Sequence, residues 1–319
     1  MKKDNHKKNI AAIIVTYNKY DYLRNTLDKT LILNFDRIII VNNASSDKTK
    51  EYLNGISSPK VDVIHLDTNI GGAGGFHTGL KKVFSQPEIK YAVVYDDDAY
   101  PTEKFINEFK NIKIPKQAGA ICSKVIDLKG NTLTYNQPRI NILGKGFKQI
   151  FSIIGITRSH LSSYEQNNGK QLEVDLSTFV GTIFDIQKIK KHNILPKKEL
   201  FIYGDDYFMS LELKKHQLKT YYYSNLVMAH DVDEKKAKSG VMVLWREYYS
   251  CRNGVLFYKN LSLPKATLLL SLRLLKRLFK VTKHDRKILY FKMVLSAHRD
   301  AFLNRYSPHD TVMRKYGKI

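Results

Sequence analysis

The chain has 319 residues and a formal net charge of +23 at pH 7, with 53 Lys and Arg against 30 Asp and Glu. A hydrophobic content of 43% with 11% aromatic residues is typical of a globular protein and excludes an intrinsically disordered one. Two cysteines, Cys122 and Cys251, are too few for a disulfide framework and form no CxxC pair, which indicates a reduced compartment and argues against a structural zinc site.

The first third of the chain alternates apolar runs with helical patterns. A basic N-terminus precedes an apolar run of only about six residues, too short for a signal-peptide core, so no secretion is expected. Helical spacing is seen at 22–33 and from about 48 to 54, where "NASSDKT" supplies capping residues. A glycine-rich loop, "TNIGGAGGF", is expected to run into a helix that ends near residue 84. The predicted buried strands are 10–16, 37–43, 61–67 and 90–96. This alternation predicts a mainly parallel, doubly wound α/β sheet.

Beyond residue 115 the pattern is less regular. A strand is expected at 118–127, irregular chain at 130–170 and strand-like chain at 172–186. Helical segments are predicted at 200–216, after an apolar entry, at 241–258, and in the tail from about 264. We therefore expect one domain over residues 1–258, with halves of about 9–115 and 116–258, followed by a tail, 259–319.

The tail is the most basic part of the chain. It carries 15 Lys and Arg against 3 Asp and Glu, a net charge of +12, whereas residues 1–258 contribute +11. Segment 266–283 is too short and too charged to span a bilayer. Its apolar stripe is Leu268, Leu272, Leu275 and Phe279, and its basic residues, largely on other faces, are Arg273, Lys276, Arg277 and Lys280. Residues 264–319 are predicted either to lie on an anionic membrane surface or to pack on the domain with a solvated basic face.

Three adjacent acids, Asp96, Asp97 and Asp98, follow the fourth predicted strand. In an open parallel sheet, ligands bind beyond the carboxyl ends of the strands. Carboxylates there suit Mg²⁺ or Mn²⁺, and Mg²⁺ in particular joins protein carboxylates to substrate phosphates. Residues two apart point the same way in extended chain, so Asp96 and Asp98 are expected to converge while Asp97 points away and contributes least. A solvated acidic turn or a helix cap is the alternative interpretation.

Four further features carry possible chemistry. The glycine stretch, which is neither a GxGxxG nor a GxxxxGK[ST] motif, suits phosphate binding through backbone amides or a flexible turn. Asp205 and Asp206 begin a predicted helix, as a general base or as caps. His230 is a candidate metal ligand or a structural histidine. The segment "WREYYSCRN" at 245–253 suits sugar stacking or ordinary packing.

The order of these motifs resembles the GT-A glycosyltransferases of family 2. The resemblance covers about residues 9–258, from "TYN" through "NNASSDKT", "NIGGAGGF", "DDD" and "GDD" to His230. The glycine stretch, the triple Asp and "WREYYSCRN" are most similar to the branch of bacterial galactofuranosyltransferases and rhamnosyltransferases. The QxxRW signature of cellulose and chitin synthases is absent.

The resemblance implies a GT-A catalytic domain with a helical, basic C-terminal extension, and it assigns roles to residues of this sequence. Asp206 corresponds to the catalytic base, and Asp96, Asp98 and His230 correspond to metal ligands. The nucleotide-sugar is expected at Thr16, Tyr17, Asn18, Asn43, Asp47, Asn69, Gly71, Gly72, Gly74, Gly75 and Asp96. The acceptor is expected at Asp205, Trp245, Arg246 and Tyr249. The sequence departs from the family at Asn42, where Asp is usual, and at Glu212, where Arg often stands.

The function that this resemblance implies is transfer of a sugar, with galactofuranose or rhamnose favoured, from a UDP- or dTDP-linked donor with Mn²⁺ or Mg²⁺. The acceptor is expected to be a hydroxyl of a lipid-linked or growing surface polysaccharide, and a single base with in-line displacement implies inversion. The expected location is cytoplasmic, peripheral on the inner face of a bacterial plasma membrane. A nucleotidyltransferase is the rival enzyme, although "TYNKYDY" lacks the glycine loop expected after the first strand. A basic nucleic-acid-binding protein is the non-enzymatic rival, although the sequence has no RNA-binding signature.

Overall fold

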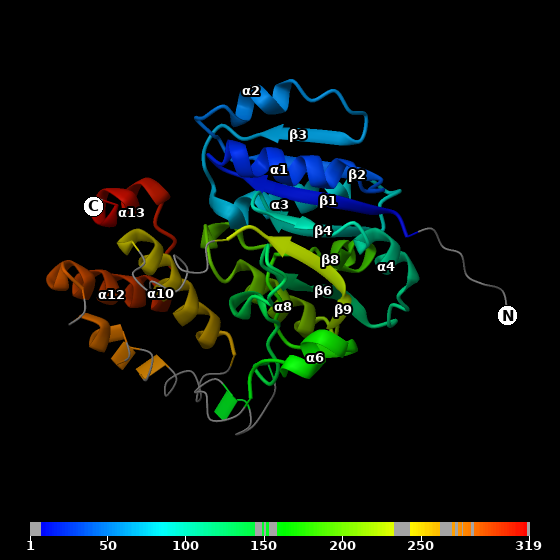
Figure 1. Ribbon diagram of the computed structural model, residues 1–319. Coiled ribbons are helices and arrows are strands. Elements are labelled where there is room, and N and C mark those ends of the chain that lie inside the picture. The colour runs from blue at the N-terminus through cyan, green and yellow to red at the C-terminus, as the bar shows by residue number, and fades with distance from the viewer. Residues whose placement is uncertain are drawn as a thin grey trace.

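The computed structural model describes residues 8–143, 149, 151–152, 158–232, 243–261, 270–271, 274–275, 277–281 and 284–317. Within them lies a nine-stranded mixed sheet with helices on both faces (Figure 1). Its strand order is β3 (Val61–His65), β2 (Arg37–Asn42), β1 (Ile10–Thr16), β4 (Tyr91–Asp96), β8 (Thr182–Asp185), β6 (Ala118–Ile126), β9 (Lys219–His230) and β5 (Ala99–Pro101), and β7 (Lys170–Val174) pairs with β9.

The four strands predicted from the first third of the chain form the parallel half of the sheet. β1 pairs in parallel with both β2 and β4, and β2 pairs in parallel with β3. Every residue of β1 is buried, because helices cover both of its faces. This explains why its sequence is a continuous apolar run rather than an alternation. The predicted doubly wound α/β sheet is confirmed.

Two hydrophobic cores hold the helices against the sheet. On one face, α1 (Tyr20–Leu31), α2 (Thr49–Asn54) and α4 (Phe105–Asn111) contribute to one core. On the other face, the second core is formed by α3 (Gly71–Phe84), α7 (Ile186–Lys191) and α8 (Asp205–Lys215). The short helix α6 (Ser163–Asn168) lies beside β9, and 3₁₀ turns occupy Thr134–Asn136 and Lys198–Leu200.

The strand-like segment predicted at 172–186 belongs to two separate strands. β7 pairs antiparallel with β9, whereas β8 inserts antiparallel between β4 and β6. Because β4 and β6 are both antiparallel to β8, they run in the same direction, and β9 is parallel to β6. The carboxyl ends of β1, β2, β4 and β9 therefore share one edge of the sheet.

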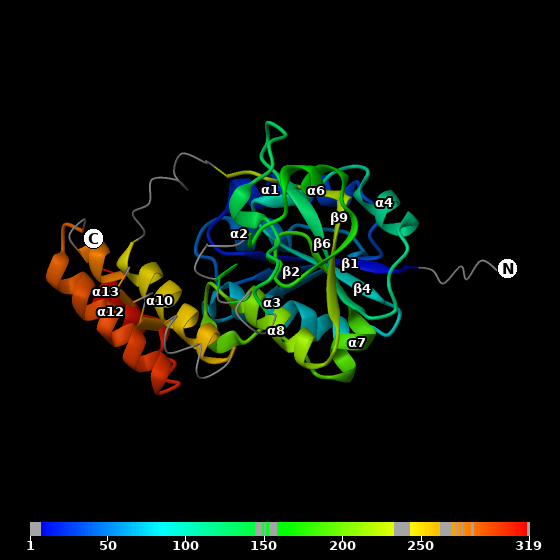
Figure 2. The same cartoon turned by 90° about the horizontal axis from the view of Figure 1, so that it is seen from below.

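The C-terminal helices form a separate cluster beside this sheet (Figure 2). α10 (Leu244–Lys259), α12 (Lys287–Phe302) and α13 (His309–Tyr316) share a core that includes Tyr248 and Tyr290. The expected domain boundary at 258 thus falls at the end of a helix whose core continues into the tail. Among the helices described, none has the length and apolar character needed to cross a bilayer.

The amphipathic stripe predicted within 266–283 is only partly described. Leu268, Leu272, Arg273 and Lys276 lie outside the described residues. Leu275 and Phe279 are exposed, whereas Arg277 is buried and forms an ion pair with Glu247 of α10. The expected solvation of this arginine was therefore wrong, because α10 supplies a buried carboxylate for it.

Candidate functional site

The edge formed by the carboxyl ends of the strands gathers the acids and the histidine singled out in the sequence. β4 ends at Asp96, and after two residues the chain turns back as β5, which pairs antiparallel with β9 and sets Ala99 opposite His230. This pairing brings Asp98 Oδ1 to 3.1 Å from His230 Nε2. The predicted proximity of Asp98 and His230 is a result of strand pairing at this edge.

His230 is buried and held from its other side as well. Its Nδ1 lies 3.1 Å from the side-chain oxygen of Asn136, and the ring of Tyr135 packs against it edge-on. When Nδ1 donates to Asn136, the ring orientation is fixed and Nε2 faces the acids, as for a metal-binding histidine. Asn136 is a site residue that the sequence did not signal, because it belongs to an irregular segment.

Asp97 has a different role from its two neighbours. Its carboxylate accepts hydrogen bonds from Thr16 Oγ1 at 2.8 Å and from the amide of Tyr17 at 3.3 Å, and its carbonyl accepts one from Thr26. Burial raises the pKa of Asp97 to about 7, even though these hydrogen bonds favour ionisation. Asp97 is not among the described residues that line the cavity found here, and its hydrogen bonds tie the end of β1 to the end of β4.

The loops after β1 and β2 hold one another through polar side chains. Asn18, at φ 52°, accepts a hydrogen bond at Oδ1 from the amide of Ser46, and its own amide donates to Ser45 Oγ. Asp47 accepts from the amides of Tyr20 and Thr49 near the starts of α1 and α2. Burial opposes ionisation of Asp47, but these hydrogen bonds outweigh it and lower its pKa. Tyr17 remains 43% exposed beside this platform.

Asn43 and Asn69 hold the entry to α3. Asn43 Nδ2 donates to Asn69 Oδ1 at 3.0 Å, and Asn43 Oδ1 accepts from the amide of Ile70. Asn69 Oδ1 also accepts from the amide of Gly71 at 2.9 Å. Both asparagines therefore bond within the protein, at the edge where the sequence predicted a nucleotide.

The two departures from the family pattern have partners of their own. Asn42 is buried, with Oδ1 accepting from the amide of Ser45 and Nδ2 lying 3.0 Å from His65 Nδ1. Glu212 pairs with Lys215 at 2.9 Å and with Lys197 at 3.6 Å. The family often has an arginine at the position of Glu212. In this chain the position holds an acid, and its ion-pair partners are two lysines.

The predicted glycine loop is instead the first turn of α3, since the helix begins at Gly71. Gly71 has φ +75°, and a Cβ there would lie 2.0 Å from the carbonyl oxygen of Phe201, so only glycine fits. A Cβ on Gly75 would lie 2.4 Å from Val15, so this glycine lets α3 approach β1, and Gly74 is similarly close to Ile70. Gly72 has open space around it and lines a cavity.

The acidic pair sits at the end of a segment with unusual backbone geometry. Phe201, Tyr203 and Gly204 all have positive φ, between 67° and 85°, directly before α8. Asn253 of α10 holds this segment by donating to the carbonyls of Leu200, Ile202 and Tyr203 at 2.8–3.0 Å. Left-handed geometry at non-glycine residues is strained and persists where the surroundings enforce it, often at functional sites.

A cavity of about 440 Å³ brings the acids of both sequence motifs together. Asp96, Asp205 and Asp206 line it with Gly72 and His230. The pKa of Asp96 is raised, first by burial and then by the nearby charge of Asp98 and of the other acids. Burial likewise raises the pKa of Asp205 to about 6, and burial together with the charge of Asp205 raises that of Asp206. Clustered acids with raised pKa values in a cavity are typical of a site that binds a cation or moves protons.

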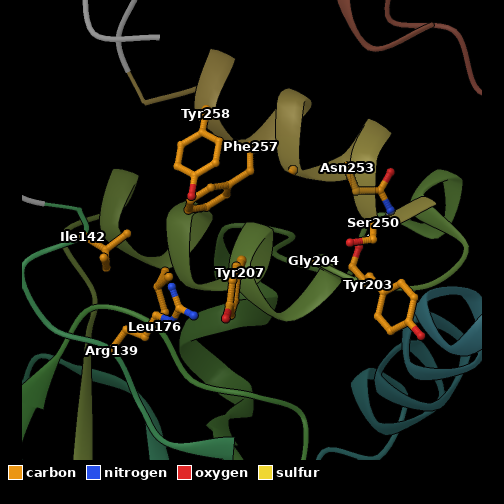
Figure 3. Close-up of a pocket in the computed structure, with 11 residues that line it drawn as sticks. Arg139, Ile142, Leu176, Tyr203, Gly204, Tyr207, Ser250, Asn253, Phe257 and Tyr258 are labelled. Carbon is orange, nitrogen blue, oxygen red and sulfur yellow. Dashed lines mark hydrogen bonds between the residues drawn. The ribbon is translucent and has the colours of Figure 1, made fainter. Parts of the chain in front are cut away.

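A smaller cavity of about 130 Å³ adjoins the first (Figure 3). The two share Tyr203, Gly204, Tyr207 and Ser250 as lining residues. Arg139 lines the smaller cavity and lies over the ring of Tyr207, 5.8 Å from its centre. Sequence reasoning missed Arg139 because nothing in its neighbourhood forms a motif.

The residues expected to bind an acceptor are only partly at this site. Asp205 lines the larger cavity, and the Arg246 guanidinium lies beside Tyr203, which lines both. Trp245 and Tyr249 line neither cavity, because they pack around His309 of α13. From "WREYYSCRN", the residue that reaches both cavities is Ser250.

The predicted metal ligands do not form a closed cage. In the described part of the chain, no three His, Cys, Asp or Glu side chains are grouped so that they could hold a metal by themselves. Asp98 and His230 are in contact, and the charge of Asp98 acts on Asp96. A cation that shares substrate phosphate oxygens needs only one or two protein carboxylates, so this arrangement fits a metal that binds together with a substrate.

The chain is similar in structure to solved glycosyltransferases. S. aureus TarS 1–349 in complex with UDP-GlcNAc has a TM-score of 0.58 and 14% identity, and the match covers 97% of this chain and 84% of that one. The mannosyltransferase PcManGT from Pyrobaculum calidifontis, in complex with GDP-Man and Mn²⁺, has a TM-score of 0.52 and 13% identity, with coverages of 96% and 78%. At such identities the likeness shows the GT-A fold. No curated protein sequence matches the chain.

The family model for glycosyl transferase family 2 matches residues 11–191, more than half of the chain. The match includes nearly all of β1, the whole of β2, β3 and β4, and the three acids Asp96 to Asp98. A glycosyltransferase of GT-A fold, this protein belongs to glycosyl transferase family 2.

Proposed function

We propose that the protein transfers a sugar with inversion from a nucleotide-diphosphate donor to an acceptor hydroxyl. The observation that supports this best is the single cavity lined by both Asp96 and Asp206, next to the Asp98–His230 contact. An in-line displacement requires carboxylates that bind the metal and nucleotide, and a base for the acceptor, within reach of one bound substrate.

Asp206 is the proposed base. Its pKa is raised by burial and by Asp205, so the carboxylate is a stronger proton acceptor than an exposed one. The acceptor hydroxyl passes its proton to Asp206 while its oxygen attacks the anomeric carbon, and the bond from that carbon to the diphosphate breaks with its electron pair leaving on the diphosphate. The hydrogen bond from the Tyr207 amide to Asp206 Oδ1, at 2.8 Å, orients the carboxylate.

Asp96, Asp98 and His230 would hold a divalent cation, Mn²⁺ or Mg²⁺. The donor set fits, because burial and the charges of the neighbouring acids raise the pKa of Asp96, and a bound cation would offset that repulsion. When bound, the ion supplies positive charge next to the departing diphosphate. Asp98 and His230 then orient each other, and Asn136 fixes the histidine ring.

The donor sugar and nucleotide are proposed from resemblance. Galactofuranose and rhamnose are favoured, carried by UDP or dTDP, and structural relatives are known with UDP-GlcNAc and GDP-Man. The nucleotide is placed on the platform of Thr16, Tyr17, Asn18 and Asp47, with Asn43 and Asn69 at its border. The sugar is placed near Gly72, which faces the cavity, while Gly71, Gly74 and Gly75 shape α3 around it.

The proposed acceptor is a lipid-linked or growing surface polysaccharide, met at the inner face of a bacterial plasma membrane. Support comes from the outer face of α12, which exposes Ile288, Phe291, Leu295 and Phe302 beside Lys287, Lys292 and Arg299. Its acidic residue, Asp300, is buried against Tyr248. Apolar side chains rimmed by cations are suited to the interface of an anionic bilayer.

A donor screen tests the function. The protein is incubated with UDP- and dTDP-linked hexoses, with Mn²⁺ or Mg²⁺ or with EDTA, and released nucleoside diphosphate is measured. We expect metal-dependent release for a subset of donors and an inverted anomeric configuration in the product. If pyrophosphate is added, formation of nucleoside triphosphate and hexose 1-phosphate from the donor would instead indicate a nucleotidyltransferase.

A further inference from the structure

The smaller cavity of Figure 3, here named the Arg139 pocket, lies on the base side of the site. It shares Tyr203, Gly204, Tyr207 and Ser250 with the catalytic cavity, and Asp206 lies within that shared stretch of chain. Asp96, His230 and Gly72 line the catalytic cavity but not the Arg139 pocket. A molecule bound in the Arg139 pocket would therefore approach Asp206 without passing the acids assigned to the donor.

The described lining of this pocket combines aromatic walls with one charged side chain. Among the described residues that line it, Arg139 is the charged one, and Tyr207, Phe257 and Tyr258 are aromatic. Figure 3 shows the guanidinium directed toward Tyr207, consistent with its position 5.8 Å from the ring centre. Aromatic faces suit a sugar or polyol, and a guanidinium suits an anion.

The backbone of Arg139 is held in place by hydrogen bonds to the segment at Asp175 and Leu176. Its amide donates to the carbonyl of Leu176 at 2.9 Å, and its carbonyl accepts from the amide of Asp175 at 2.8 Å. Across the described residues, its guanidinium forms no ion pair and no hydrogen bond to protein. A half-buried guanidinium whose charge reaches Asp206 only at a distance, without a direct ion pair among the described residues, is a favourable position for an anion supplied by a ligand.

We propose that the Arg139 pocket binds an anionic group of the acceptor, a phosphate or a carboxylate carried close to the hydroxyl that Asp206 deprotonates. This rests on the proposed function. The anion takes no part in the bond changes: the hydroxyl proton goes to Asp206, and the electron pair of the broken bond leaves with the nucleoside diphosphate. Arg139 fixes the position of the acceptor through two parallel N–H···O bonds. The substrate class is thus a sugar or polyol bearing a negative charge.

The alternative is that Arg139 serves to lower the pKa of Asp206, and the test must distinguish this role from anion binding. Burial and Asp205 raise the pKa of Asp206, and the positive charge of Arg139 lowers it in part. Arg139→Lys keeps that charge but cannot form the two-pronged contact, whereas Arg139→Gln loses both. Arg37→Gln is the matched control, because it removes one arginine charge at the start of β2, the opposite edge of the sheet.

The test measures binding by calorimetry to the full chain with saturating UDP and Mn²⁺. The probes are glycerol 1-phosphate and glucuronate, with glycerol and glucose as their neutral counterparts. We expect the anionic probes to bind more tightly, Arg139→Gln to weaken them about tenfold or more, and Arg139→Lys to weaken them less. Arg37→Gln should leave the affinity for every probe unchanged. The anionic probe that binds more tightly shows whether the pocket prefers a phosphate or a carboxylate.

Two outcomes would overturn the proposal. One is unchanged binding of both anionic probes to Arg139→Gln. The other is a weaker affinity of that variant for UDP, which would assign the pocket to the donor. Failure of the proposed function is read separately, as an absence of nucleotide release from every donor in the screen, because probe binding requires no transfer.

Discussion

Asp98 and His230 are 132 residues apart in the chain, yet Asp98 Oδ1 lies 3.1 Å from His230 Nε2. The contact follows from β5, which turns back after the acids and pairs with β9 so that Ala99 faces His230. If both residues bind the metal, removing the histidine should lower the affinity for the metal ion more than it lowers the stability of the fold.

His230→Gln is therefore expected to raise the Mn²⁺ concentration needed for half-maximal activity by about tenfold or more. The measurement is initial rate against Mn²⁺ concentration at saturating donor. His192→Gln is the control, since His192 stacks on His216 away from the site. Identical Mn²⁺ curves for His230→Gln and the wild type would remove His230 from the metal site.

Asp206→Asn is expected to reduce kcat by about 10²–10⁴-fold, because the amide cannot accept the acceptor proton. Affinity for UDP, measured by calorimetry, should remain close to that of the wild type. A variant that kept near-wild-type turnover would exclude Asp206 as the base.

Asp97→Asn should make stability less dependent on pH. The pKa of Asp97 is about 7 in the folded protein and about 4 in the unfolded chain. The folded state thus holds this proton more tightly, so the stabilisation is full below about pH 4 and is lost as the pH rises toward 7. Denaturant unfolding at pH 5 and pH 8 should show the variant gaining stability relative to the wild type at pH 8. The asparagine oxygen can still accept from Thr16 and Tyr17, and an equal difference at both pH values would contradict the assignment.

Asn253→Ala should release the strained segment before α8. The variant loses three hydrogen bonds to backbone carbonyls, which predicts a loss of about 1–3 kcal/mol in stability. It should also lower kcat more than donor affinity, since Asp206 follows that segment directly. Asn260→Ala is the control, because Asn260 donates only to Leu256 within α10 among the bonds described. Wild-type kcat in Asn253→Ala would show that the segment does not position the base.

The outer face of α12 should bind vesicles that contain anionic lipid. Replacing Ile288 and Phe291 by Ser is expected to reduce co-sedimentation with phosphatidylglycerol vesicles severalfold, because both side chains are exposed. Ile32→Ser removes an equally exposed apolar side chain from the end of α1 and should have no effect. Equal binding to neutral phosphatidylcholine vesicles, or no effect of the double change, would argue against this face.

The sequence alone determined the parallel half of the sheet and its acids. The apolar run 10–16 and the apolar centre of 90–96 indicate strands buried on both faces, so the acids Asp96 to Asp98 were expected at the carboxyl edge of the sheet. The sequence also singled out the pair Asp205 and Asp206, because an acidic pair at the head of a helix is visible as a local pattern, and the family resemblance selected Asp206 as the base.

Only the tertiary structure decided how these parts combine. The pairing of β5 with β9, the hold of Asn253 on the segment before α8, and the place of Arg139 beside Tyr207 depend on residues far apart in sequence. The same applies to the glycines of α3, whose need for small size comes from Phe201 and Val15 pressing against them. Local patterns record which face of an element is buried, whereas these contacts are set by packing between elements, which no short stretch of sequence encodes.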